Sequence, residues 1–109
     1  MPERPEDRYS VDFLVYISWQ DKAGVIRRGS GRCLDLSESG ARLETQDRFE
    51  PRTNVLLHSE QFGRMGNASI RYCRRERMHY AVGLEFSAAF GLSDPVRKSI
   101  LGGVLKAAY

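Results

Sequence analysis

Hydrophobic and polar residues alternate along most of the chain, which is the pattern of strands with one buried face. The alternation predicts a long strand over residues 11–20 and a second over 25–34, joined by a turn at 21–24. We expect a bulge or bend within the second strand, because small residues interrupt it at positions 29–31. The chain is therefore predicted to begin with a long β-hairpin.

Shorter alternating runs follow and predict further strands. They cover residues 41–45, 54–59, 68–73 and 80–86. The segment 46–53 contains Pro51 and is predicted to be a loop. Residues 63–66 have the GxxG form of an RNA-binding loop, but that loop needs flanking helices. Because its neighbours alternate like strands, we interpret it as a hairpin turn, and we place an exposed hairpin tip at 74–77.

The last segment of the chain has a helical period instead. Ser93 or Asp94 can cap a helix with Pro95 in its first turn, and apolar residues recur on one stripe as far as Ala108. Short strands at this spacing are typical of an antiparallel sandwich or a small barrel. We favour a barrel, because closure removes exposed edges. The predicted fold is all-β: a six-stranded antiparallel β-barrel with a C-terminal α-helix.

The composition is that of one globular domain. The chain has 109 residues, of which 41% are hydrophobic, and no apolar run approaches the roughly 18 residues of a membrane span. No secretory signal is recognised at the N-terminus, so we expect a cytoplasmic protein that does not associate with a membrane. The net charge of +3 suits an anionic ligand but is small for a protein that coats a nucleic-acid polymer.

Residues that would support catalysis or metal binding are not grouped in this sequence. Cys33 and Cys73 lie outside any CxxC pair or Cys/His cluster. His58 and His79 have no second ligand near them in sequence, and the GxSxG, HExxH and Walker motifs are absent. We therefore expect neither an enzyme nor a metal or cofactor site.

A polar segment, Asp-Leu-Ser-Glu-Ser-Gly at residues 35–40, separates the second and third predicted strands. Its composition is typical of a tight turn, because Asp and Ser bond nearby backbone groups and Gly accepts positive φ. The alternative is that Asp35 and Ser37 present acceptors at the end of a strand, while Gly40 lets a flat ligand approach the backbone. The segment alone favours the turn.

Two arginines in the first ten residues change that balance. Residues 1–10 are polar and without periodicity, so we expect them to be mobile, and they carry Arg4 and Arg8 in the spacing RxxxR. One predicted hairpin later the chain has DxSxxG at residues 35–40. With both motifs in this order, and with the strand ending at residues 82–86, the chain resembles the PilZ domain, the bacterial receptor module for cyclic di-GMP.

The resemblance implies a stand-alone receptor. Residues 1–10 would be a switch segment and residues 11–109 the barrel with its helix. The ligand-binding residues implied by the two motifs are Arg4, Arg8, Asp35, Ser37 and Gly40. The barrel would hold the last three, and the arginines would fold over the ligand, so that the ordered N-terminus signals to a downstream protein partner.

The chemistry of the ligand agrees with these residue types. Arginine pairs bidentately with the O6 and N7 edge of guanine and also binds phosphate, and a carboxylate accepts from the guanine N–H donors. Tyr72 is a further candidate, for stacking on a base, because family members often have a large side chain near there. A place in the barrel core, on one face with Ala68 and Ile70, is equally compatible with the pattern.

Two other functions remain possible at this stage. A divergent PilZ-like adaptor would contact proteins without binding nucleotide, but such members typically lack the arginines or the Asp/Ser pair. Non-specific nucleic-acid binding would use a group of arginines and would be steeply salt-dependent. The arginines in question are Arg71, Arg74, Arg75 and Arg77.

Overall fold

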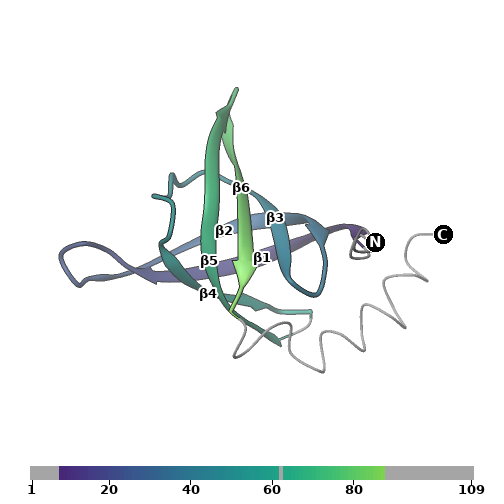
Figure 1. Ribbon diagram of the computed structural model, residues 1–109, viewed down its shortest axis with the longest axis horizontal. Coiled ribbons are helices and arrows are strands. Elements are labelled where there is room, and N and C mark those ends of the chain that lie inside the picture. Colours follow the sequence, from purple (N-terminus) through teal and green to yellow (C-terminus); the bar gives the residue numbers. More distant parts are fainter. Residues whose placement is uncertain (1–7, 62, 88–109) are drawn as a thin grey trace, which may run out of the picture.

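The computed structural model describes residues 8–61 and 63–87. Within these ranges six strands form a closed antiparallel barrel in the order β1-β2-β3-β6-β5-β4 (Figure 1). The strands are β1 (Tyr9–Gln20), β2 (Ile26–Leu36), β3 (Gly40–Thr45), β4 (Asn54–Ser59), β5 (Gly63–Glu76) and β6 (His79–Phe86). The predicted all-β barrel is confirmed, whereas the predicted C-terminal helix lies outside the described residues.

Alternation along β1 explains how the barrel is filled. Val15 and Ile17 are buried, whereas Leu14 and Tyr16, at the alternate positions, are exposed. Pairing of β1 with both β2 and β4 closes the sheet, so its inner face has neighbours on every side. The largest side chains of the core come from β1, β2, β3, β4, β5 and β6 alike, which gives one continuous core. No helix in the described ranges is long and apolar enough to cross a membrane.

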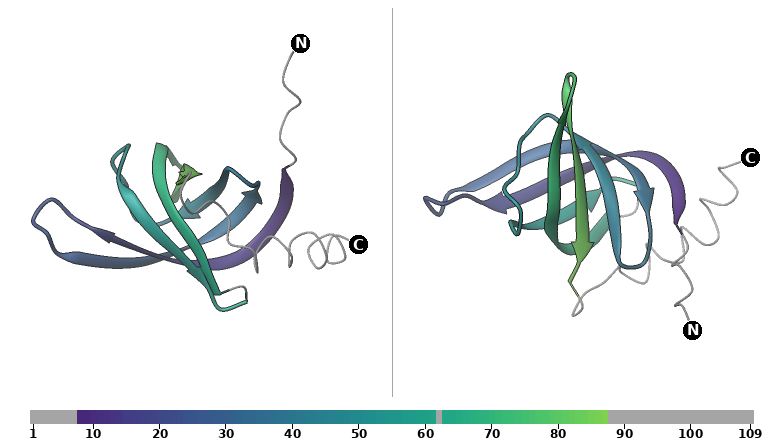
Figure 2. Two further views of the ribbon diagram at one scale, coloured as in Figure 1. Left: turned by 60° about the horizontal axis from the view of Figure 1, so that its bottom comes forward. Right: turned by 45° about the horizontal axis from the view of Figure 1, so that its top comes forward.

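The hairpin of β1 and β2 projects beyond the barrel, as the two further views make clear (Figure 2). At its base the loop after β3 folds back, and Phe49 is buried against Trp19, with ring centroids 4.6 Å apart. Trp19 is the single tryptophan of the chain. Its fluorescence therefore reports on the packing of the barrel.

Two local predictions are wrong. Gly29 and Gly31 pair in register with Ile17 and Val15, so the expected bulge at residues 29–31 is absent. The GxxG segment is not a hairpin turn: β5 begins at Gly63, and the chain turns at Glu60 and Gln61 instead. In the second case the glycines belong to an irregular part of a strand: Gly63 and Gly66 have positive φ, and the register with β4 shifts between Leu57 and His58.

Candidate functional site

Four strands align polar and aromatic residues in one row across the outer wall of the barrel. Asp35 on β2 lies opposite Arg42 on β3, Arg42 lies opposite Gly83 on β6, and Gly83 lies opposite Tyr72 on β5. Neighbouring strands are about 4.8 Å apart, so the row spans about 14 Å. It brings together residues that are up to 48 positions apart in the sequence.

Both ends of the row face outward because of β-bulges. In β2 the register shifts between Cys33 and Asp35, so that Leu36 is buried and Asp35 is turned to the outer surface. Uninterrupted alternation from the buried Cys33 would have put the Asp35 carboxylate into the core, which is costly. A bulge adds one residue to a strand and reverses the alternation beyond it.

The second bulge is in β5, where the register shifts between Ile70 and Tyr72. Ile70 points into the core, and the two residues after it, Arg71 and Tyr72, are both exposed. Tyr72 keeps 41% of its surface exposed, so the alternative that placed it in the barrel core is wrong.

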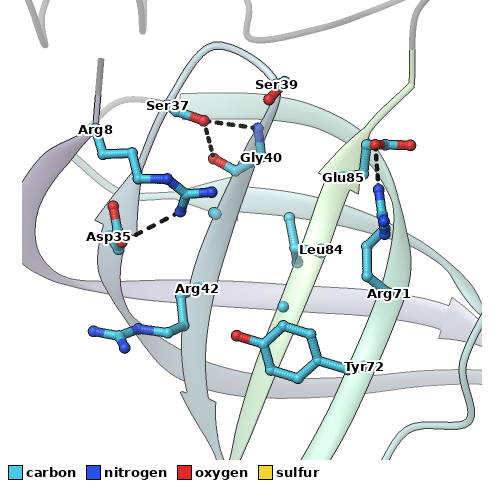
Figure 3. Close-up of a pocket in the computed structure, with 12 residues that line it drawn as sticks. Arg8, Asp35, Ser37, Ser39, Gly40, Arg42, Arg71, Tyr72, Leu84 and Glu85 are labelled. Atoms are coloured by element: carbon cyan, nitrogen blue, oxygen red, sulfur yellow. Dashed lines mark hydrogen bonds and ion pairs between the residues drawn. The ribbon is translucent and has the colours of Figure 1, made fainter. Parts of the chain in front are cut away.

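The row forms the floor of a cavity of about 400 Å³ (Figure 3). The cavity is lined by Arg8, Asp35, Ser37, Ser39, Gly40, Ala41, Arg42, Arg71, Tyr72, Gly83, Leu84 and Glu85. Each residue predicted to bind ligand that the structure describes is among them, and Arg4 lies outside the described residues. Sequence reasoning missed the positions on β3 and β6, namely Arg42, Gly83, Leu84 and Glu85.

Arg8 and Asp35 form the polar end of the cavity. The Arg8 Nη1 atom lies 3.4 Å from Asp35 Oδ2, and the Arg8 side chain is 69% exposed against 23% for Asp35. An exposed pair at this distance contributes little, about 0–1 kcal/mol. The second oxygen, Asp35 Oδ1, is buried and has no hydrogen-bond partner among the described residues. A buried acceptor without a donor costs about 1–3 kcal/mol, so this end of the cavity favours a ligand that brings donors.

Ser37 and Gly40 build the turn between β2 and β3. The Ser37 N–H donates to Gly40 O at 2.9 Å, and the Gly40 N–H donates to Ser37 Oγ at 3.2 Å. The Ser37 hydroxyl also donates to Gly40 O at 3.3 Å, and Ser37 is only 4% exposed. The turn predicted for this segment is confirmed, and the Ser37 hydroxyl is hydrogen-bonded to the Gly40 backbone within it.

Gly40 allows close packing of two strands and does not supply the positive φ that a turn glycine often has. Its φ does not lie in the left-handed region, in contrast to Gly24, Gly63 and Gly66. A Cβ atom at Gly40 would lie 2.4 Å from the backbone oxygen of Leu84 on β6. The glycine therefore allows the close approach of β3 and β6 beside the cavity.

Tyr72 forms the aromatic end of the cavity. Its ring lies against Gly83 on β6, where an added Cβ atom would come within 2.0 Å of Tyr72 Cε2. The missing side chain thus leaves room for the ring to lie across the neighbouring strand. The Arg74 guanidinium lies 5.6 Å from the ring centroid, a cation–π contact. Tyr72 is thereby held as an exposed flat surface.

Charges of both signs surround the cavity. Arg71 pairs with Glu85 across β5 and β6, with Nη1 and Oε2 2.6 Å apart. Arg8 pairs with Asp35, as described above. The lining residues therefore carry three arginines against two carboxylates, and a surplus cation remains.

Among the described residues, the cavity has neither a metal-binding cluster nor a reactive thiol. No group of three His, Cys, Asp or Glu side chains in residues 8–61 and 63–87 is arranged to hold a metal ion. Cys33 lies beneath Asp35, and burial raises the pKa of its thiol to about 12. At neutral pH that thiol is protonated and belongs to the core.

A family model for the PilZ domain matches residues 2–94, and the chain belongs to this family. Solved structures with the same fold include the complex of MrkH from K. pneumonia with c-di-GMP, with a TM-score of 0.68, 14% identity, and coverage of 99% of this chain and 55% of MrkH. The PilZ domain of YcgR from Escherichia coli with c-di-GMP has a TM-score of 0.67 and 12% identity, with 98% and 95% covered.

MrkH in its apo state is also similar, with a TM-score of 0.62, 15% identity, and coverage of 99% of this chain and 53% of that one. At these identities the likeness concerns the fold, and the chain spans about half the length of MrkH. A search of curated protein sequences finds no match.

Proposed function

We propose that this PilZ domain is a receptor for cyclic di-GMP and binds it in the cavity on the outer wall of the barrel. The residues that we assign to the site are Arg4, Arg8, Asp35 and Tyr72, which would contact the ligand, and Ser37 and Gly40, which would support Asp35. Two structures of similar fold were solved with c-di-GMP, MrkH and the PilZ domain of YcgR, which supports the choice of ligand. The function is binding and signalling, without turnover of the ligand.

The observation that carries the proposal is the pairing of Arg8 with Asp35, two motif residues 27 positions apart, at one end of an open cavity. The exposed ion pair is weak, so Arg8 is available to a stronger partner. When its guanidinium turns to the O6 and N7 edge or to a phosphate of the ligand, the Asp35 carboxylate is released. Its two oxygens then accept from the guanine N1–H and N2–H donors, including the oxygen that lacks a donor now.

The other guanine would stack on Tyr72. Base–aromatic stacking contributes about 1–3 kcal/mol per base. The ring is exposed, and Gly83 and Arg74 keep it flat against β6, so little ordering is needed on binding. Ser37 and Gly40 act through the turn that fixes Asp35 at the cavity.

The signal would come from the N-terminal segment. Arg8 is the first described residue and borders the cavity, so it lies beside the proposed ligand. We propose that Arg4 joins Arg8 over the ligand and that the segment then offers a new surface to a downstream protein partner. Part of the binding energy would be spent on ordering this segment.

Titration calorimetry with cyclic di-GMP tests the proposal. Asp35→Asn keeps the shape of the side chain but turns an acceptor into a donor, and we expect a loss of about 1.5–3 kcal/mol, the scale of a hydrogen bond to a charged group. Asp12→Asn is the matched control, because Asp12 is an exposed carboxylate on β1 that pairs with Arg32 outside the cavity. No heat with the wild-type chain at high micromolar ligand would refute the proposal, and equal affinities of the two variants would remove Asp35 from the site.

A further inference from the structure

Three arginines line the cavity, and they differ in what they contact. Arg8 is paired with Asp35, and Arg71 is paired with Glu85. The Arg42 side chain, in contrast, makes no hydrogen bond or ion pair with any residue of the described ranges, although Arg42 is exposed on β3. The surplus positive charge of the cavity is therefore located on one side chain.

The position of Arg42 in the row indicates which part of a ligand it meets. It lies between Asp35 on one neighbouring strand and Gly83 on the other, with Tyr72 one strand further away. In Figure 3 its side chain leaves β3 below Asp35 and extends away from Tyr72, on the Asp35 side of the row. Arg42 is thus about one strand spacing, 4.8 Å, from the polar end of the row and about two from the aromatic end.

We infer that Arg42 is a phosphate-binding residue of this receptor, an inference that rests on the proposed function. Cyclic di-GMP has two guanines joined through a ring that contains both phosphodiesters. With one base at Asp35 and the other on Tyr72, that ring would lie over the middle of the row, where the Arg42 side chain leaves β3. A guanidinium with no carboxylate partner binds phosphate bidentately without first breaking an ion pair.

This role differs from that of the motif arginines. Arg8 must leave Asp35 before it can contact the ligand, whereas Arg42 projects from the middle of a barrel strand and is available beforehand. Arg42 would therefore attract the dianionic ligand before Arg8 has left Asp35.

The test compares Arg42→Ala and Arg42→Lys with Arg28→Ala by titration calorimetry with cyclic di-GMP. Arg28 is a matched control, because it is an exposed strand arginine on β2 that does not line the cavity. We expect Arg42→Ala to lose at least tenfold in affinity, Arg42→Lys to recover part of it, and Arg28→Ala to bind like the wild type. The ³¹P resonances of the bound ligand should shift less with Arg42→Ala than with the wild-type protein.

Two results would count against Arg42 in different ways. If the wild type binds and Arg42→Ala binds equally well, with unchanged ³¹P shifts, the inference is wrong while the proposed function stands. If the wild type does not bind cyclic di-GMP at all, the proposed function fails and the inference fails with it. Thermal unfolding followed by Trp19 fluorescence checks that each variant is folded.

Discussion

Gly83→Ala is the substitution that should change ligand affinity with the least effect on the stability of the barrel. The new Cβ atom would lie 2.0 Å from Tyr72 Cε2, 2.5 Å from Cζ and 2.6 Å from Cδ2, where ordinary contact begins at 3.4 Å. The ring must therefore withdraw by about 1.4 Å. The atoms it meets are the far end of a flexible and exposed side chain, so the ring can move without displacing a strand.

The magnitude follows from what the ring is proposed to do. A stacked base is worth about 1–3 kcal/mol, and loss of the flat placement should remove about 1 kcal/mol or more, which is about fivefold in affinity. Gly83 has no positive φ, so alanine fits its backbone, and the free energy of unfolding should change by less than about 1 kcal/mol. Ligand binding and stability should thus respond separately.

A double-mutant cycle tests whether the effect of Gly83→Ala on affinity depends on Tyr72. Titration calorimetry is done on the wild type, Gly83→Ala, Tyr72→Ala and the double variant, with urea unfolding followed by Trp19 fluorescence. In the Tyr72→Ala background the ring is gone, so Gly83→Ala should have no further effect on affinity. If Gly83→Ala weakens binding equally with and without Tyr72, or leaves affinity unchanged when Tyr72 is present, the stacking role of Tyr72 is refuted.

Three further predictions concern the neighbouring residues. Gly40→Ala should lower the free energy of unfolding by about 1–3 kcal/mol in urea titrations, because its Cβ would meet the Leu84 backbone oxygen at 2.4 Å; a neutral effect would contradict the close approach of β3 and β6. Ser37→Ala should cost about 1 kcal/mol of stability even without ligand, because the hydroxyl bonds Gly40 within the turn; an unchanged midpoint would return Ser37 to a purely ligand-binding role. The pKa of Cys33 is raised to about 12 by burial, so the unfolded chain loses this proton first, and stability should fall as pH rises from about 9 towards 12. The advantage of the wild type over Cys33→Ala should shrink by about 2 kcal/mol between pH 8 and 10.5, and a constant difference would contradict the burial.

The alternating pattern was sufficient to predict the strands, because burial of one face is the main constraint on each of them. Val15 and Ile17 are flanked by less buried neighbours as expected, and β3 and β4 also alternate, whereas residues 81–84 of β6 are all buried. The GxxG segment was misassigned because glycine supplies positive φ in irregular strands as well as in turns, and both Gly63 and Gly66 have positive φ.

The bulges were the part of the site that the sequence did not reveal directly. For Asp35 a signal existed, because regular alternation from Cys33 to Leu36 would bury a carboxylate. For Tyr72 no such conflict arises, since tyrosine suits both the core and an exposed surface. Only the register between β5 and β6 determines whether Tyr72 faces the core or the surface, because a one-residue shift moves a side chain to the other face of the sheet.

Arg42 and Gly83 could not be recognised from sequence for another reason. Each is an ordinary strand residue, and its role depends on which residue lies opposite it on the next strand. The order of strands in the barrel, with β3 beside β6, is the information that places them between Asp35 and Tyr72. The two motifs can be recognised from short stretches of sequence. The residues of the cavity floor can be recognised only when the order of the strands is known.

The most direct test of ligand binding on the outer wall is a map of amide chemical shifts upon titration with cyclic di-GMP. We predict that the largest changes follow the row from Asp35 through Arg42 and Gly83 to Tyr72 and include the first ten residues. Changes confined to the arginine-rich tip at residues 74–77, or no changes at saturating ligand, would contradict the proposed site.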